Sequence, residues 1–158
     1  LRVRSTPGEG TRFTLCLPLL SAEPVDTADR SEDTPSYEGR CVLVAEDNPV
    51  NQLVIRTMLE RFGVQIIMAG DGEQCLELWD AHRPDIILMD CQMPECDGFT
   101  ATRRIRERGG DLPIIAVTAN TMPGDRDASL EAGMDDHLAK PIRPEELAQQ
   151  LRRWLTAA

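Results

Sequence analysis

Residues 41–63 read CVLVAEDNPVNQLVIRTMLERFG, and this stretch changes character partway along. It opens with an apolar run, CVLVA, as a strand buried on both faces would. After it, Pro49 suits the first turn of a helix and Gly63 suits its end. The stretch therefore predicts a strand over 41–45 and a helix over 49–63, with an inward face made of Val50, Leu53, Val54, Met58 and Leu59.

The same strand-then-helix unit recurs along the rest of the chain. We predict strands at 64–69, 85–90, 112–119 and 135–140, and helices at 71–82, 98–109, 122–133 and 143–155. In the second helix, Leu76 and Trp79 are expected to point inward. The strands are continuous apolar runs, which is typical of parallel strands covered on both faces. The pattern predicts an α/β fold: a doubly wound, five-stranded parallel sheet with helices on both faces.

Two zones before residue 39 do not follow this rhythm. Residues 1–20 alternate apolar and polar side chains around a Gly-rich turn, which predicts a two-stranded hairpin. Residues 21–38 contain six acids against one arginine and few large apolar groups, so we interpret them as an acidic flexible linker. The regular domain is expected to span 39–158.

The bulk composition restricts the classes of function. A formal net charge of −10 argues against non-specific binding to nucleic acid, whose phosphates would repel the surface. The chain has no apolar run of about eighteen residues and no secretion signal at its start, so we expect a cytosolic fragment without membrane contact. The five cysteines form no CxxC pair, which suits a reducing compartment. A metal or redox role for Cys91 and Cys96 is a minor alternative.

Polar side chains stand where the predicted strands end. In an open parallel sheet the binding crevice lies beyond the carboxyl ends of the strands, so such residues meet at one edge. Lys140 is the single lysine among seventeen basic residues, which indicates a position that needs a compact ammonium and not a planar guanidinium. The residues at this edge are Glu46 and Asp47 after the first strand, Asp90 after the third, Thr118 after the fourth and Lys140 after the fifth.

This combination of groups favours phosphoryl transfer. Three carboxylates repel one another unless a cation lies between them, and Mg²⁺ prefers oxygen ligands of this kind. Lys140 adds positive charge, Thr118 can donate a hydrogen bond to an oxyanion, and an Asp carboxylate can itself become an aspartyl phosphate. Singly, Asp47 could be a helix cap, Thr118 a loop hydroxyl and Lys140 a surface charge. Their joint placement at the ends of four strands indicates a site.

Four motifs resemble those of response-regulator receiver domains, in particular receivers fused to hybrid sensor histidine kinases. They are VLVAEDNPVNQ (42–52), DIILMDCQMPECDGF (85–99), PIIAVTAN (113–120) and HLAKPI (137–142). The resemblance covers residues 39–156 and implies a flavodoxin-like (βα)5 fold.

The same resemblance implies roles for individual residues. Asp90 would accept a phosphoryl group from a phosphohistidine, and Thr118 and Lys140 would contact the phosphoryl oxygens. The Lys140–Pro141 bond would be cis, as X–Pro bonds tolerate. Mg²⁺ would be bound by the side chains of Glu46, Asp47 and Asp90 and by the backbone carbonyl of Gln92.

One position departs from the family pattern. Receivers usually carry Tyr or Phe three residues before the lysine, as an aromatic that reports phosphorylation together with the hydroxyl residue, here Thr118. This chain has His137 there, and an imidazole is smaller and titrates near neutral pH. A switching role for His137 therefore stands against a plain edge-strand role. The other histidine, His82, is expected to be a charge partner at the end of the second helix.

The first zone is similar to a different domain. STPGEGTRFTLCLPL (5–19) resembles the extreme end of the ATP-binding domain of sensor histidine kinases. Residues 1–20 would then be a remnant of that domain, and the chain would be the tail of a longer polypeptide. Such a remnant cannot bind ATP by itself.

The receiver resemblance implies a phosphoacceptor module in a bacterial two-component phosphorelay. The phosphodonor would be the histidine kinase core of the same protein, and the acceptor a histidine phosphotransfer domain. The fragment would catalyse only its own phosphorylation and dephosphorylation. Its partner surface would comprise 122–133, 135–140 and 143–155, and no nucleic acid would bind.

Three alternatives stay open on the residues. A phosphatase of the haloacid-dehalogenase type would have a second Asp two residues after the nucleophile, where this chain has Gln92. A flavodoxin-like cofactor binder would have a phosphate loop rich in Ser, Thr and Gly where this chain has EDNPVN. A receiver that docks partners without phosphorylation finds support only in His137.

Overall fold

The computed structural model describes residues 2–6, 8, 10–14, 16, 35–119 and 123–156, with the side chains of 123–126 left out. The chain forms two compact units, Leu1–Asp33 and Thr34–Ala158. Most of the predicted linker lies outside the described residues. None of the helices in the described ranges has the length and apolar character needed to cross a bilayer.

The first unit contains the predicted hairpin. Strand β1 (Arg2–Thr6) pairs antiparallel with β2 (Gly10–Thr14), and all of their residues are exposed. Gly10 has a φ of +101°, a backbone conformation that favours glycine at the start of the second strand. The expectation of two strands around a Gly-rich turn is confirmed.

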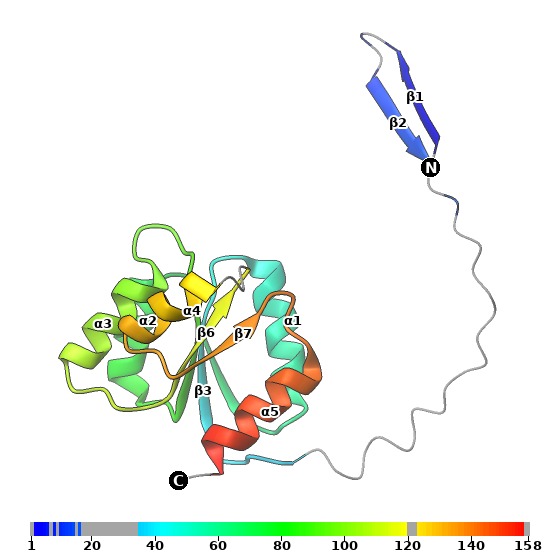
Figure 1. Ribbon diagram of the computed structural model, residues 1–158. Helices are drawn as coiled ribbons and strands as arrows, with labels where there is room; N and C mark the ends of the chain where they lie inside the picture. The colour runs from blue at the N-terminus through cyan, green and yellow to red at the C-terminus, as the bar shows by residue number, and fades with distance from the viewer. Residues whose placement is uncertain are drawn as a thin grey trace. The chain divides into compact units, whose positions relative to one another are not determined.

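The second unit is built on a five-stranded parallel sheet (Figure 1). Its spatial order is β4-β3-β5-β6-β7, so the chain crosses from one side of β3 to the other after β4. This reversal puts a crevice at the carboxyl ends of β3 and β5. The strands are β3 (Cys41–Ala45), β4 (Gln65–Ala69), β5 (Ile86–Asp90), β6 (Ile114–Thr118) and β7 (Asp136–Ala139).

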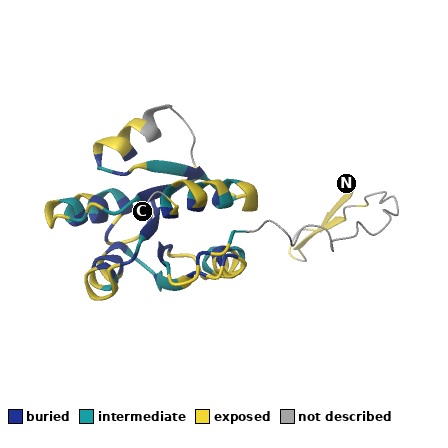
Figure 2. Cartoon of the chain, turned by 90° about the horizontal axis from the view of Figure 1, so that it is seen from below, coloured by how far each residue is buried: buried dark blue, intermediate teal, exposed yellow. Residues whose placement is uncertain are grey.

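Helices cover both faces of this sheet, as the sequence predicts. One buried cluster packs side chains of α2 and α3 against the strands, and a second packs side chains of α1 and α5 against the other face. Figure 2 shows buried strands between helices whose outer sides are exposed. The helices are α1 (Pro49–Glu60), α2 (Gly72–His82), α3 (Gly98–Glu107), α4 (Pro123–Glu131) and α5 (Pro144–Leu155).

The predicted inward face of α1 is partly wrong. Val50, Leu53 and Val54 are 66%, 64% and 46% exposed, and the residues that α1 buries are Ile55 and Leu59. The helix is rotated because its first turn directs polar side chains toward the end of β3. As a result, three apolar side chains of α1 stay exposed.

The chain enters the second unit through a buried tyrosine. Tyr37 is 7% exposed, its N–H donates to the carbonyl of Phe62 at 2.8 Å, and the two ring centroids are 6.4 Å apart. Tyr37 belongs to the range interpreted as linker, so ordered packing begins before Gly39.

Candidate metal centre

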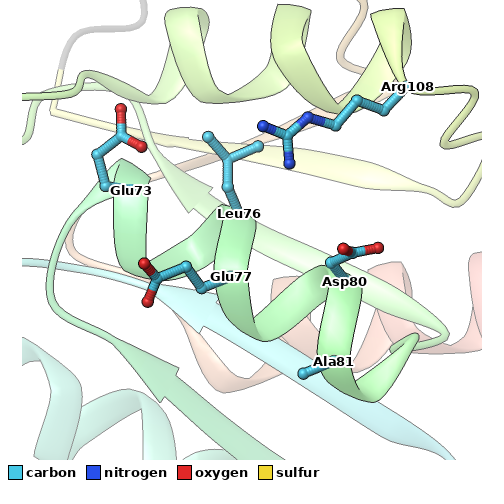
Figure 3. Close-up of a pocket in the computed structure, with 6 residues that line it drawn as sticks. All are labelled: Glu73, Leu76, Glu77, Asp80, Ala81 and Arg108. Atoms are coloured by element: carbon cyan, nitrogen blue, oxygen red, sulfur yellow. The ribbon is translucent and has the colours of Figure 1, made fainter.

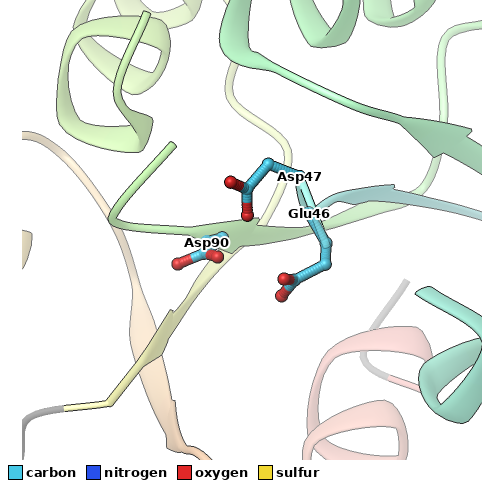
Figure 4. Close-up of side chains that lie close together, drawn as sticks. All are labelled: Glu46, Asp47 and Asp90. Carbon is cyan, nitrogen blue, oxygen red and sulfur yellow. The ribbon is translucent and has the colours of Figure 1, made fainter. Parts of the chain in front are cut away.

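Three carboxylates meet at the carboxyl ends of β3 and β5 (Figure 4). Glu46 and Asp47 follow β3 directly, and Asp90 is the last residue of β5. Each of the three offers an oxygen within 4.8 Å of the other two. Glu46 and Asp90 are 1% and 3% exposed, whereas Asp47 is open to solvent. The sequence therefore located this cluster correctly.

The ammonium of Lys140 lies against two of these carboxylates. Its Nζ is 2.7 Å from Oε2 of Glu46 and 2.5 Å from Oδ2 of Asp90. The N–H of Lys140 donates to the carbonyl of Thr118 at 2.8 Å, and the Lys140–Pro141 bond is cis as expected. Burial alone would lower the pKa of Lys140, but hydrogen bonds and charge from Asp90 and Glu46 outweigh it. The pKa of Lys140 is therefore raised, and the ammonium stays charged.

Asp90 is held at both oxygens. Oδ2 accepts from Lys140, and Oδ1 accepts from the N–H of Gln92 at 3.0 Å. Burial raises the pKa of Asp90, and the hydrogen bonds from Lys140 and Gln92 offset part of the rise. Asp90 is thus a desolvated carboxylate beside a fixed cation, an arrangement typical of functional carboxylates.

The cluster has the charge and chemistry for a hard divalent cation. Three carboxylates and one ammonium leave a formal charge of −2, and the donors are oxygens, which Mg²⁺ prefers. Within the described ranges this is the group of side chains close enough to hold a metal ion. Cys91 and Cys96 are buried and are not part of this group. Burial raises the pKa of Cys96, which makes that thiol a poor metal ligand.

The other predicted site residues are Thr118, Gln92 and His137, and they differ in their relation to this cluster. Thr118 ends β6 on the same edge of the sheet and pairs with Ala139. Gln92 touches Asp90 through its N–H, and its carbonyl as a ligand stays a prediction. His137 lies further down β7, opposite Ala116, so the structure does not bring it into the cluster.

His137 has its own surroundings. Its Nδ1 is 3.6 Å from Oδ1 of Asp136, and its side chain is half-exposed beside Ser129 and Leu130. His82 lies in the last turn of α2, as the sequence predicts.

The sequence pattern did not identify the polar residues that hold Glu46. Asn51 Nδ2 donates to Oε1 of Glu46 at 2.9 Å, and the N–H of Asn48 reaches the same oxygen at 3.3 Å. Gln52 Nε2 donates to the backbone carbonyl of Glu46 at 2.6 Å. The signal was available: two amide side chains in the first helical turn after a carboxylate at a strand end.

A groove of about 440 Å³ opens beside the cluster. Residues of α1 and residues after β7 line it, together with Glu46 and Lys140 of the cluster. Its other lining residues are Asn51, Val54, Ile55, Pro141 and Ile142. Val54, one of the exposed apolar side chains of α1, therefore lines a groove that Glu46 and Lys140 of the cluster also line.

A second groove, of about 450 Å³, is formed by α2 and the C-cap residue of α3 (Figure 3). It also carries three acids, Glu73, Glu77 and Asp80, with Arg108 across from them. These carboxylates belong to an exposed helix surface and do not form a metal-sized cluster.

Comparison with known proteins gives a consistent result. Residues 42–152 match the sequence profile of the response regulator receiver domain. Sensor protein EvgS of Escherichia coli K12 is 34% identical over 153 residues, which cover 96% of this chain and 13% of EvgS. The chain spans 7% of hybrid signal transduction histidine kinase I of Dictyostelium discoideum and 20% of two-component system protein A of Emericella nidulans, so it covers a small part of these relatives.

Two solved structures are informative. The receiver domain of sensor histidine kinase PA1611 from Pseudomonas aeruginosa, with magnesium in its active-site cleft, is 48% identical with a TM-score of 0.69. That match covers 75% of this chain and 98% of the other. The receiver of Saccharomyces cerevisiae Ssk1, solved with the histidine phosphotransfer protein Ypd1, is 26% identical with a TM-score of 0.72 and coverage of 79% and 92%.

Proposed function

Because this chain belongs to the response regulator receiver domain family, we propose that Asp90 is the phosphoacceptor of a phosphorelay. The observation that carries the proposal is the carboxylate of Asp90, buried between Lys140 and the acids Glu46 and Asp47. A desolvated carboxylate next to a fixed ammonium and a place for a cation suits attack on phosphorus.

The transfer step follows from these groups. A carboxylate oxygen of Asp90 attacks the phosphorus of a phosphohistidine, and an O–P bond forms as the P–N bond breaks. The electron pair of the broken bond stays on the imidazole nitrogen. Lys140 stabilises the charge on the phosphoryl oxygens, and the hydroxyl of Thr118 donates a hydrogen bond to one of them.

Mg²⁺ is the cofactor that fits this site. Glu46, Asp47, Asp90 and the backbone carbonyl of Gln92 would hold it, and it would supply neutralising charge at the phosphoryl group. The negative charge of the cluster and the magnesium in the PA1611 receiver support this assignment.

The partners we propose are proteins that carry histidine. The donor is the kinase core of the same polypeptide, and the acceptor is a histidine phosphotransfer domain. The complex of the Ssk1 receiver with Ypd1 supports contact between domains of these two kinds. Val50, Leu53 and Val54 support docking at α1, because an exposed apolar patch beside a reactive centre is suited to a protein partner. The surface of α4, β7 and α5 remains our proposed output surface, with His137 as a candidate switch residue.

We place this receiver in the cytoplasm as part of a hybrid sensor kinase. In that arrangement residues 1–20 are the end of an ATP-binding domain, 21–38 are a linker and 39–158 are the receiver. The hairpin supports this reading, because two exposed strands are not stable alone and fit the edge of a larger sheet. The match to EvgS, which covers 96% of the chain, supports it as well.

Phosphorylation with a small-molecule donor tests the proposal. The protein is incubated with acetyl phosphate and Mg²⁺, and its intact mass is recorded beside Asp90→Asn and Asp80→Asn. Asp80 is the matched control, an exposed acid of the second groove. One phosphoryl adduct is expected in the unmodified protein and in Asp80→Asn, none in Asp90→Asn, and none after removal of Mg²⁺ with EDTA.

Three other outcomes would change the proposal in different ways. An adduct that persists in Asp90→Asn would place the acceptor elsewhere. If no adduct forms and beryllofluoride leaves the amide spectrum unchanged, the chain is a docking module without phosphorylation. If beryllofluoride shifts the amides around Thr118 but not those around His137, the site is active and His137 is no switch.

A further inference from the structure

Asn51 is a polar residue of the first turn of α1 that the proposed transfer step does not use. Its side-chain amide donates to Oε1 of Glu46 at 2.9 Å. We propose that Asn51 is a positioning residue, which fixes the orientation of Glu46 and through it the metal site. This inference rests on the proposed function. It adds a residue that is not one of the proposed metal ligands and forms none of the hydrogen bonds described for Asp90.

Glu46 needs such a restraint because both of its oxygens must be satisfied at a buried position. The residue is 1% exposed, and an unpaired carboxylate oxygen there would be costly. Oε1 accepts from Asn51 and more distantly, at 3.3 Å, from the N–H of Asn48, while Oε2 faces Lys140 at 2.7 Å. Asn51 therefore supplies the shorter of the two hydrogen bonds at Oε1 and restrains the rotation of the carboxylate that contacts Lys140.

The orientation of Glu46 in turn affects Asp90. Lys140 contacts both carboxylates, at 2.7 Å and 2.5 Å, so its ammonium is positioned by the pair. If Glu46 turns, Lys140 loses one of two anchors and its distance from Asp90 is no longer fixed. Asn51 thus acts on the phosphoacceptor through two intervening charged groups.

The first turn of α1 is held by several hydrogen bonds, which orient Asn51 as a donor. Asn48 caps the helix: its Oδ1 accepts from the N–H of Val50 at 2.9 Å and of Asn51 at 3.4 Å. Gln52 ties the same turn to the backbone carbonyl of Glu46 at 2.6 Å. A donor on a capped helical turn is pre-oriented and needs no rearrangement to hold the carboxylate.

A plain structural role for Asn51 is the competing explanation, and Gln52 provides the matched control. Asn51→Leu and Gln52→Met each keep the approximate length of the side chain and remove one hydrogen bond from the same turn. Asn51→Leu removes a hydrogen bond to the carboxylate of Glu46. Gln52→Met removes a hydrogen bond to the backbone carbonyl of Glu46. A structural role would make the two variants alike.

Mg²⁺ affinity, measured by isothermal titration calorimetry, distinguishes them. Partners that orient metal ligands typically contribute about 10–100-fold to metal affinity, so Asn51→Leu is expected to weaken Mg²⁺ binding by about tenfold. Gln52→Met leaves the hydrogen bonds to the Glu46 carboxylate in place, so it should weaken Mg²⁺ binding clearly less. Without metal, the amide resonance of Gln92, which reports on Asp90, should move further in Asn51→Leu than in Gln52→Met.

Each outcome decides a separate point. If the unmodified protein neither binds Mg²⁺ nor forms an adduct, the proposed function fails. If it does both and Asn51→Leu binds Mg²⁺ equally well, the role of Asn51 is overturned and the proposed function stands. Equal loss in Asn51→Leu and Gln52→Met also overturns it. Should Asn51→Leu not fold, Asn51→Ser, whose shorter hydroxyl cannot reach Glu46, is measured against the same expectations.

Discussion

The receiver unit carries two groups of three acids, and only one resembles a reaction centre. Glu46, Asp47 and Asp90 come from the ends of adjacent strands and have oxygens within 4.8 Å of one another. The α2 group, defined as Glu73, Glu77 and Asp80, lies along one exposed helix face. Both groups have the same formal charge, so charge alone does not make a site.

The difference lies in how each group is compensated. In the α2 group, Glu73 pairs with Arg104 and Asp80 pairs with Arg83 at 2.8 Å, all on the surface where water screens the charges. The strand-end cluster shares one ammonium among buried carboxylates, which leaves uncompensated negative charge. Buried carboxylates that converge with too few cations to neutralise them would be stabilised by a metal ion.

The largest contrast is expected from removing one acid of each group. Asp47→Asn removes the solvent-accessible acid of the cluster, which we propose as a metal ligand. It should weaken Mg²⁺ binding by about 100-fold, the upper end of the effect of a residue that only orients a ligand. Glu77→Gln should leave the affinity unchanged. Titration calorimetry of both variants measures the contrast, and equal affinities would mean that the two acidic groups do not differ in kind.

The next contrast concerns the cations. Lys140→Arg keeps the charge but replaces a compact ammonium with a planar fork in a half-buried site, so it should slow phosphorylation of Asp90. We expect about a tenfold loss at saturating Mg²⁺, less than the roughly 10²–10³-fold typical of removing a charge-stabilising donor. Arg108→Lys, in the second groove, is the control and should leave the rate of phosphorylation unchanged. Adduct formation followed over time gives both rates, and an unaffected Lys140→Arg would refute the need for lysine.

A smaller effect is expected from the packing beneath the site. A Cβ added at Gly98 would lie 2.1 Å from the carbonyl oxygen of Asp90 and 2.9 Å from Cγ of Met89. Gly98→Ala should therefore lower the free energy of unfolding by about 1–3 kcal/mol, as overpacking does. At Gly70, before α2, the nearest atom would be 3.5 Å away, so Gly70→Ala serves as control. Urea denaturation measures the free energy of unfolding of both variants. An unchanged value for Gly98→Ala would show that the backbone after β5 can shift to accommodate the methyl group.

The smallest effect is expected in the α2 group itself. Arg104→Gln breaks the surface pair with Glu73 and should leave the midpoint of thermal unfolding nearly unchanged. A clear drop in that midpoint would show that the α2 group is a structural network and not a solvated surface.

The sequence predicts the strand-end cluster well because its residues follow directly from the strands. Apolar runs such as 41–45 locate the strands, and the residue after each run must then lie at the same edge of the sheet. Lys140 was identified because no other lysine exists in the chain.

Two features could not be read from pattern alone. The face that α1 buries is set by hydrogen bonds from Asn51 and Gln52 to Glu46, a tertiary constraint that overrides the apolar spacing of Val50 and Val54. The burial of Tyr37 depends on its contact with Phe62, which directly follows the end of α1. The acidic segment around Tyr37 carries no local signal of that contact.

The most direct test of the central claim is to locate the phosphoryl group chemically. The protein is phosphorylated with acetyl phosphate and Mg²⁺, treated with borohydride, which reduces an acyl phosphate to an alcohol, and digested for peptide mass spectrometry. We predict homoserine at position 90 and unmodified Asp at positions 47 and 80. Homoserine at either of those positions, with Asp90 unmodified, would contradict the assignment of Asp90 as the phosphoacceptor.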